Sequence, residues 1–224
     1  MIFSKLQFTL FITLTLLLIV LSYFYLDKNI SLYFIEHADT YKAYGKEVSK
    51  LGESHWYIGI ALIGIFYYKF IKINELYKQR FLFLLYANLF SGIISIVTKI
   101  LIGRFRPWKL ENGEDGFGFL ISQNPDFSFL QNLKYQVDML VQNSTHYSSF
   151  PSGHTTTSLT VFTFMMILFP KQYYLWITIT LLGVSARILA NDHFVSDVLA
   201  GILLGTISTL FIYSKMKEKI EKTY

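Results

Sequence analysis

The chain has 224 residues, of which 53% are hydrophobic, 18% are aromatic and only 16% are charged, with a net charge of +5. Soluble domains carry about 25% charged residues, so this composition excludes an ordinary soluble domain or a disordered chain and indicates a polytopic membrane protein. The complete absence of cysteine excludes a disulfide scaffold, thiol catalysis and thiolate metal sites.

Apolar segments long enough to cross a bilayer need about 20 residues. The first is expected over residues 6–26, a run that is too long for a signal peptide and lacks its small-residue cleavage site. A polar segment, 27–53, follows and contains a candidate interfacial helix around its Tyr-Phe-Ile run. Five further spans are then expected over residues 54–73, 81–102, 153–169, 172–190 and 194–214.

The predicted fold is therefore all-α, a single membrane-embedded domain over residues 1–224 with six transmembrane helices. An even number of spans puts both termini on one side of the membrane. The longest connection, 104–150, is either an irregular solvated loop or a lid beside a site, because loops of this length are usually functional or disordered.

Basic residues decide the orientation, because they favour cytoplasmic loops. With the N-terminus inside, the inner segments hold ten basic and three acidic residues, a charge of +7, and the rest of the chain carries −2. This predicts an N-in, C-in topology. It also accounts for the net positive charge of the chain without a nucleic-acid-binding surface. The inner basic residues are Lys5, Lys69, Lys72, Lys78, Arg80, Lys171, Lys215, Lys217, Lys219 and Lys222.

Ionisable residues inside membrane spans cost about 2.5–3.5 kcal/mol each at a helix centre and are therefore functional candidates. Six such residues lie at or near the ends of the third to sixth expected spans, and under the predicted orientation all six belong to the outer leaflet. They are Lys99, Arg106, His154, Arg187, His193 and Asp197.

Lys99 and Arg106 are seven residues apart, so they share a helix face if the helix continues to Pro107. Two cations at the membrane rim suit a phosphate clamp, in which Arg106 supplies a planar fork of donors. The alternative is that both side chains only anchor the helix end at the interface.

The segment 151–154, Pro-Ser-Gly-His, directly precedes an apolar helix. Ser152 is a good N-cap, Gly153 allows close approach to the backbone, and the free amides of a first turn attract anions. His154 at this position can protonate a leaving oxygen. The alternative is a simple helix cap with a surface histidine.

His193 and Asp197 are four residues apart and are expected to be neighbours on one helix face. A carboxylate that holds one ring nitrogen leaves the other free to attack. With Arg187 close by, the parts suit phosphoryl transfer through a covalent phosphohistidine. The alternative is a structural pair at a helix start.

These segments resemble the motifs of the type 2 phosphatidic acid phosphatase superfamily, which comprises integral-membrane lipid phosphatases. Its first motif, Lys, six residues and Arg-Pro, is matched by Lys99, Arg106 and Pro107, and its second, Pro-Ser-Gly-His, by residues 151–154.

The third motif of that superfamily is Ser-Arg, five residues, His, three residues and Asp. Arg187, His193 and Asp197 match it, but Ala186 replaces the serine and Ser185 lies one position too early. The change puts a supporting hydrogen bond in doubt and leaves the chemistry intact. The resemblance covers residues 54–214, so the first span and the segment after it are expected to add topology only.

The resemblance implies a role for each matched residue. His193 would be the nucleophile, Asp197 its orienting partner and His154 the general acid. It also implies that no metal or other cofactor is needed, and the sequence has no carboxylate cluster of the kind that holds Mg²⁺. The phosphoryl oxygens would be bound by Lys99, Arg106, Ser152, Gly153 and Arg187.

The sequence thus predicts a lipid phosphatase of a bacterial cytoplasmic (inner) membrane, with its site on the periplasmic or extracellular side. Polyprenyl diphosphate, phosphatidylglycerol phosphate, phosphatidate and lipid A phosphates are equally acceptable substrates at this stage. Two alternatives stay open: a lipid phosphotransferase that uses the same phosphohistidine, and a non-catalytic lipid transporter.

Overall fold

The computed structural model describes residues 4–110, 117–118 and 126–221, and within these ranges the chain is helical with no β-strand. Part of the expected 104–150 connection and the basic residue Lys222 lie outside the described residues. The elements are α1 (Lys5–Tyr25), α2 (Asp27–Glu36), α3 (Ala38–Ser49), η1 (Lys50–Gly52), α4 (Ser54–Phe66), η2 (Tyr67–Ile71), α5 (Glu75–Ile102), η3 (Pro107–Leu110), α6 (Phe129–Tyr147), α7 (Gly153–Leu168), η5 (Pro170–Gln172), α8 (Tyr173–Leu189) and α9 (Val195–Ile220).

Polar caps fix where several of these helices begin. Ser4 and Ser128 each form a capping box with the glutamine three residues later, at the starts of α1 and α6. The Asn74 side chain accepts a hydrogen bond from the Tyr77 amide and starts α5. That helix ends at Gly103, whose positive φ of 54° is the left-handed conformation that commonly terminates helices.

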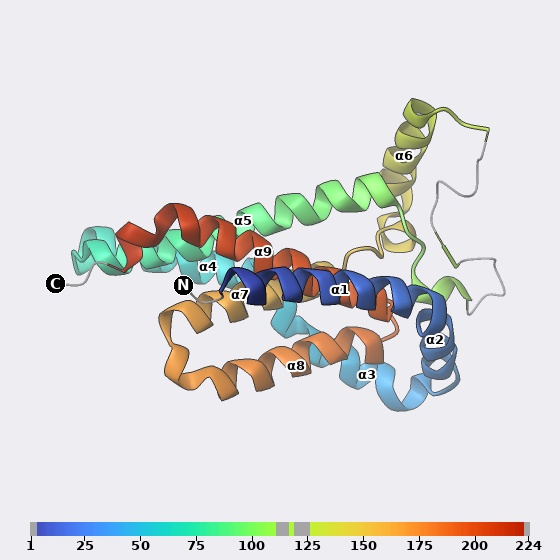
Figure 1. Ribbon diagram of the computed structural model, residues 1–224, viewed down its shortest axis with the longest axis horizontal. Coiled ribbons are helices and arrows are strands. Elements are labelled where there is room, and N and C mark those ends of the chain that lie inside the picture. Colours follow the sequence, from blue (N-terminus) through green and yellow to red (C-terminus); the bar gives the residue numbers. More distant parts are fainter. Residues whose placement is uncertain (1–3, 111–116, 119–125, 222–224) are drawn as a thin grey trace.

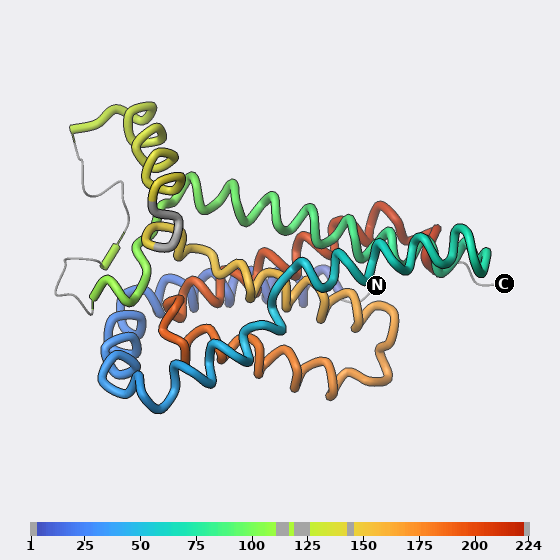
Figure 2. Tube along the Cα trace, turned by 180° about the vertical axis from the view of Figure 1, so that it is seen from behind, coloured from blue at the N-terminus to red at the C-terminus, as the bar shows by residue number. Residues whose placement is uncertain are grey.

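The long helices form an elongated bundle around α9, which packs against α1, α5 and α7 (Figure 1). Helix α1 begins and α9 ends toward the same end of the bundle, whereas α2, α3 and α6 lie toward the other end (Figure 1). Seen from behind, α4 runs beside α5, and α3 lies against α8 (Figure 2). Of the predicted catalytic residues, His154 and Asp197 lie in the first turns of α7 and α9, and His193 lies just before α9.

The distribution of polarity is the reverse of that in a soluble bundle. Small and hydroxyl residues fill much of the interior, and Thr160 donates to Ser91 at 3.0 Å between α7 and α5. Large apolar side chains instead cover the outside, such as Leu6 at 69%, Ile63 at 71% and Leu181 at 62% exposure. Such an exterior suits lipid, and small interior residues are typical of helix contacts in membranes.

Helices occupy all six positions where spans were expected, but only α1, α5 and α9 are both long and apolar enough to be candidate spans among the described residues. Helix α4 ends at Phe66 and continues as the π-helical turn η2. Helices α7 and α8 have 16 and 17 residues, and at about 1.5 Å per residue they are shorter than a hydrocarbon core of about 30 Å. The fold is therefore all-helical, with three candidate spans.

The segments expected between spans contain more helix than the sequence suggested. The polar segment 27–53 forms α2, α3 and η1. Helix α6 occupies much of the 104–150 connection, so the interpretation of that connection as an irregular loop was wrong for residues 129–147. Its capping box, a serine followed three residues later by glutamine, is a helix signal that the sequence carried.

Candidate active site

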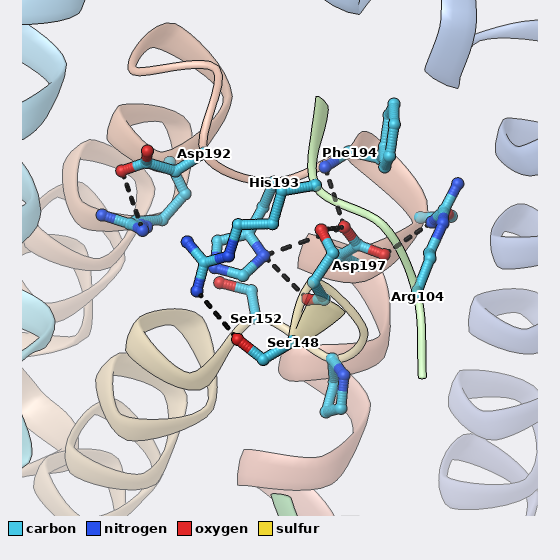
Figure 3. Close-up of polar contacts among 12 residues, drawn as sticks. Arg104, Ser148, Ser152, Asp192, His193, Phe194 and Asp197 are labelled. Atoms are coloured by element: carbon cyan, nitrogen blue, oxygen red, sulfur yellow. Dashed lines mark hydrogen bonds and ion pairs between the residues drawn. The ribbon is translucent and has the colours of Figure 1, made fainter. Parts of the chain in front are cut away.

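The turn at 148–152, between α6 and α7, is the centre of the candidate site. Its backbone carbonyls and hydroxyls bond to side chains from the ends of α5 and α9 and from the segments beside them (Figure 3). The structure thereby brings all three motif segments together. Lys99, Arg106 and Arg187 also exert electrostatic effects on both His154 and His193.

His193 is buried, with 2% of its surface exposed. Its Nδ1 lies 2.8 Å from the Ser149 carbonyl oxygen and 3.7 Å from Asp197 Oδ2 (Figure 3). A carbonyl can only accept, so Nδ1 carries the proton and donates it to Ser149, which leaves the lone pair on Nε2. Burial, reinforced by the nearby cations, holds the pKa of His193 well below its usual range, although Asp197 opposes this shift.

The expectation that His193 and Asp197 are neighbours on one helix face needs correction. His193 precedes the first residue of α9, Val195, so the pair is not a contact on one helix face. The closer partner of His193 Nδ1 is the Ser149 carbonyl oxygen, and the Asp197 carboxylate lies farther from that nitrogen. The spacing of four residues correctly drew attention to His193 and Asp197. The hydrogen bond to Nδ1, however, comes from the Ser149 carbonyl in the 148–152 turn.

Asp197 is completely buried, and both of its carboxylate oxygens have donors. Oδ2 accepts from Ser149 Oγ at 2.6 Å and from the Phe194 amide at 2.9 Å. Oδ1 accepts from Arg104 Nη1 at 2.5 Å. The backbone carbonyl of Asp197 also accepts from the Ser152 amide at 3.0 Å, which joins the start of α9 to the start of α7.

Lys99, near the end of α5, donates through Nζ to the carbonyl of Ser148 at 2.5 Å and to that of Pro151 at 2.7 Å. An ammonium group has three donors, so two of them hold the turn and one remains for a ligand. Lys99 therefore shapes the turn as well as adding charge, and the alternative of simple anchoring at the interface does not describe it.

Arg106 reaches the site by a different route from the one expected. Helix α5 stops at Gly103, and the next residues run extended, with a bridge between Arg104 and Ser148. Arg106 then donates from Nη2 to Ser148 Oγ at 3.3 Å, and burial lowers the pKa of its guanidinium. Lys99 and Arg106 thus meet at Ser148 but do not share a helix face.

Arg187, near the end of α8, is 4% exposed, and its Nη2 lies 3.0 Å from Asp192 Oδ2 (Figure 3). Among the described residues, the Nε groups of both Arg106 and Arg187 are buried without a hydrogen-bond partner. Buried polar groups in folded proteins nearly always have partners. Two unsatisfied guanidinium donors in one site therefore point to an anionic ligand.

The second motif caps α7 as expected. Ser152 Oγ accepts from the Thr155 amide at 3.4 Å and from Thr155 Oγ1 at 2.9 Å, and its own proton stays available. Gly52 in η1 packs against His154, since a Cβ placed on Gly52 would lie 2.8 Å from His154 Cβ. The described residues contain no group of three or more His, Asp or Glu side chains arranged to hold a metal ion.

A model of the PAP2 superfamily matches residues 80–221, which is more than half of the chain and includes all three motif segments. The chain belongs to the PAP2 superfamily. The resemblance seen in the sequence is thereby confirmed.

Individual relatives of this PAP2 chain include lipid phosphatases. The lipid A 1-phosphatase of Rhizobium etli is 26% identical over 187 residues, which cover 78% of this chain and 72% of that protein. The bacitracin transport permease protein BcrC of Bacillus licheniformis is 30% identical over 96 residues, 43% of this chain and 45% of that protein. The lipid A 4'-phosphatase of Porphyromonas gingivalis is 33% identical over 66 residues, 29% of this chain and 28% of that protein. No solved structure matches. Together these similarities support a membrane lipid phosphatase.

Ala186, the departure from the third motif, is buried at a close helix crossing in this PAP2 chain. Helix α3 crosses α8 so closely at Gly45 that a Cβ there would lie 2.8 Å from the Ala186 carbonyl oxygen and 2.5 Å from the Ala190 amide. Ala186 is 0% exposed and Ala190 is 1% exposed. Small residues on both helices permit this close crossing.

Sequence reasoning missed Arg104 and Ser149, which contact a motif residue of this PAP2 chain, and Asp27, which contacts Arg104. Arg104 and Ser149 bond directly to Asp197. Asp27 bonds to Arg104 from the α1–α2 junction, so the expectation that the N-terminal part adds topology only was wrong. An acidic residue just past the end of an apolar run was the available signal for Asp27.

Proposed function

We propose that this chain hydrolyses a lipid phosphate or diphosphate monoester at the outer face of the membrane, through a phosphohistidine on His193. One observation carries the proposal: a buried imidazole, hydrogen-bonded through Nδ1 to a carbonyl, presents its Nε2 lone pair in a site with three cations. The low pKa of His193 keeps the ring neutral near pH 7, as a nucleophile requires.

In the first step, Nε2 of His193 attacks the phosphorus, and the bond from phosphorus to the lipid oxygen breaks. His154 donates a proton to that oxygen, so the lipid leaves as an alcohol, or as a lipid monophosphate if the substrate is a diphosphate. Lys99, Arg106 and Arg187 neutralise the charge that spreads over the phosphoryl oxygens. Asp197 stabilises the positive charge on the phosphorylated ring.

In the second step, water attacks the phosphorus of the phosphohistidine and the phosphorus–nitrogen bond breaks. His154, now neutral, accepts the proton of the attacking water, and inorganic phosphate leaves. His193 thereby recovers its lone pair on Nε2. Because three fixed cations and the first-turn amides of α7 surround the phosphoryl group, we propose that the reaction needs no metal, so EDTA should leave the rate unchanged.

A cavity of about 350 Å³ supports a substrate whose polar headgroup extends beyond one phosphate. It adjoins Asp192, the partner of Arg187, and two lysines of α3, Lys42 and Lys46, also line it together with Trp108. Cationic and aromatic side chains suit a second phosphate or a sugar. As candidate substrates, lipid diphosphates and lipid A therefore rank above phosphatidate. Lipid A is also the substrate in the names of the relatives called lipid A phosphatases.

We also propose that α4 with η2, α7 and α8 cross the membrane with the three candidate spans, in the N-in, C-in orientation. The short helices α7 and α8 meet at η5, which carries Lys171, one of the basic residues that favour the cytoplasmic side. In this arrangement the motif residues lie at the outer face, as expected for an enzyme of the bacterial inner membrane.

The test is phosphate release by purified, detergent-solubilised protein from a panel of four lipids: a polyprenyl diphosphate, phosphatidylglycerol phosphate, phosphatidate and lipid A. His193→Ala should abolish release, and His154→Ala should lower it by about 100-fold or more, because the nucleophile and the proton donor are lost. His55→Ala, on an exposed histidine outside the site, should release phosphate at the wild-type rate. Full activity of His193→Ala would contradict the assigned role.

Trapping the intermediate separates this mechanism from its alternatives. A lipid labelled in its phosphate should leave label on wild-type protein denatured in alkali, where phosphohistidine survives, and none on His193→Ala. Label that later appears on a second lipid, with no inorganic phosphate, would establish the phosphotransferase. A protein that never carries label and releases no phosphate would favour the transporter.

A further inference from the structure

Asp27 and Arg104 form a buried chain of charges that ends on Asp197, and none of the proposed chemical steps uses them. The side chains of both residues are 0% exposed. Asp27 is the first residue of α2, and Arg104 lies in the extended segment after α5. The cost of burying such charges is large unless they are paired, so their arrangement calls for a physical explanation.

Arg104 spans two carboxylates. Its Nη2 donates to Asp27 Oδ2 at 2.8 Å. Its Nη1 donates to Asp197 Oδ1 at 2.5 Å (Figure 3). Ser196 closes the arrangement, because its amide donates to Asp27 Oδ1 at 2.9 Å and its hydroxyl donates to Asp27 Oδ2. Arg104 Nη1 also donates to that hydroxyl at 2.7 Å.

Aromatic rings hold the guanidinium in place. The Phe194 ring lies 4.2 Å from the Arg104 guanidinium carbon, and those of Tyr23 and Phe117 lie at 5.2 and 5.7 Å. The site is therefore anchored by α1, by the α1–α2 junction and by the residue that precedes α9. A cation that is both stacked and bidentate has little freedom to turn.

We propose that Asp27 and Arg104 are positioning residues for the phosphatase reaction: together they fix the Asp197 carboxylate and set the charge that it presents to His193. The proposal rests on the proposed function of His193. Arg104 holds one oxygen of Asp197, so the other is directed to Ser149, Phe194 and His193. Asp27 shares the charge of Arg104, so that Asp197 is not fully neutralised.

Asp27 lies outside residues 80–221, the part of the chain that the PAP2 model matches. The contact between Asp27 and Ser196 joins residues 169 positions apart. A shift of α1 or α2 would therefore move Arg104 and, through it, Asp197.

The test compares kcat, KM and the pH profile for Asp27→Asn, Arg104→Gln and the double variant. The value of kcat should fall by about 10-fold to 100-fold in each single variant, since small misplacements of catalytic groups cost about this much. KM should stay near the wild-type value, because Asp27 and Arg104 bond to Asp197 and Ser196, which are not proposed phosphate ligands. Asp39→Asn, which removes an exposed acid from α3, is the matched control and should match the wild type.

The acidic limb of the pH profile distinguishes positioning from a merely structural role. His193 must be neutral to attack, so this limb follows its pKa. Loss of the negative charge of Asp27 destabilises the protonated ring and moves the limb to lower pH, whereas loss of the positive charge of Arg104 moves it to higher pH. The double variant should return the limb toward the wild type. The charged groups that face His193 directly, and stay unchanged in all of these variants, are Lys99, Arg106, Arg187 and Asp197.

Arg104→Lys keeps the charge and removes the fork, so it should lower kcat without moving the limb. If Asp27→Asn or Arg104→Gln fails to fold, Arg104→Lys still tests whether the geometry of the guanidinium contributes to kcat. A wild-type kcat in Asp27→Asn, or activity losses with no opposite shifts of the limb, would overturn the proposal. Failure of the proposed function would look different, because the wild type itself would then release no phosphate from any lipid of the panel.

Discussion

At Gly153, the effect of a substitution on phosphate binding can be separated from its effect on folding stability. A Cβ added there would lie 3.9 Å from Lys99 Cε and 4.0 Å from Ser95 Oγ, so the described protein leaves room for it. In the proposed mechanism the phosphate uses that space. Gly153→Ala should therefore change the free energy of unfolding by less than about 0.5 kcal/mol but raise KM about 10-fold, measured by thermal melting and phosphate release.

Gly92→Ala is the matched control, since nothing lies within 4 Å of its added Cβ, and it should leave KM unchanged. A wild-type KM in Gly153→Ala would mean that phosphate does not approach this backbone.

At the residue scale, the sequence identified the motif residues because each has its own chemical signature. It failed where two residues distant along the chain had to be paired. Asp27 and Arg104 are 77 positions apart, and no local pattern links them. Lys99 and Arg106 do not share a helix face because Gly103 terminates α5, and a glycine at this position is a helix-end signal that the sequence contained.

At the element scale, α7 and α9 pack closely, and at their N-terminal ends the Ser152 amide donates to the Asp197 carbonyl at 3.0 Å. Gly205 of α9 faces α7, and a Cβ on it would lie 2.4 Å from the Thr156 carbonyl oxygen. Gly205→Ala should destabilise the protein by about 1–3 kcal/mol, because α9 must move away from α7. It should also lower kcat, because the same movement separates the catalytic ends. Thermal melting and phosphate release measure both effects.

Gly59→Ala in α4, where an added Cβ meets nothing within 4 Å, is the control for introducing a methyl group into an apolar helix. If Gly205→Ala melted at the wild-type temperature, the close contact between α7 and α9 would be wrong. Gly201 and Gly205 form the spacing that favours close helix packing in membranes, so this contact was readable from the sequence.

The helices themselves were largely predictable, because apolar runs identify them well. Hydropathy alone did not indicate how far each would extend. The run expected at 54–73 divides into α4 and a π-helical turn. The expected start at residue 81 was six residues late, because Asn74 caps α5 before its apolar part begins. Capping residues therefore carried information about helix ends that mean hydropathy did not.

At the scale of the whole molecule, the proposed N-in, C-in topology makes opposite predictions for two exposed positions. The chain has no cysteine, so a single introduced thiol is the only one that can react. Val141 in α6 is 80% exposed at the end of the bundle near the motif residues, and Lys171 is exposed in η5 at the turn between α7 and α8. Because basic residues favour the cytoplasmic side, position 171 should face inward and position 141 outward.

A membrane-impermeant maleimide should therefore label Val141→Cys in intact cells and label Lys171→Cys only after the membrane is permeabilised. Phosphate release measured on the same variants confirms that each is folded, because neither position contacts the site. The reverse labelling pattern would place the motif residues on the cytoplasmic face. Labelling of both positions from outside would mean that α7 and α8 do not cross the membrane, which would leave the charge asymmetry of +7 against −2 without a structural cause.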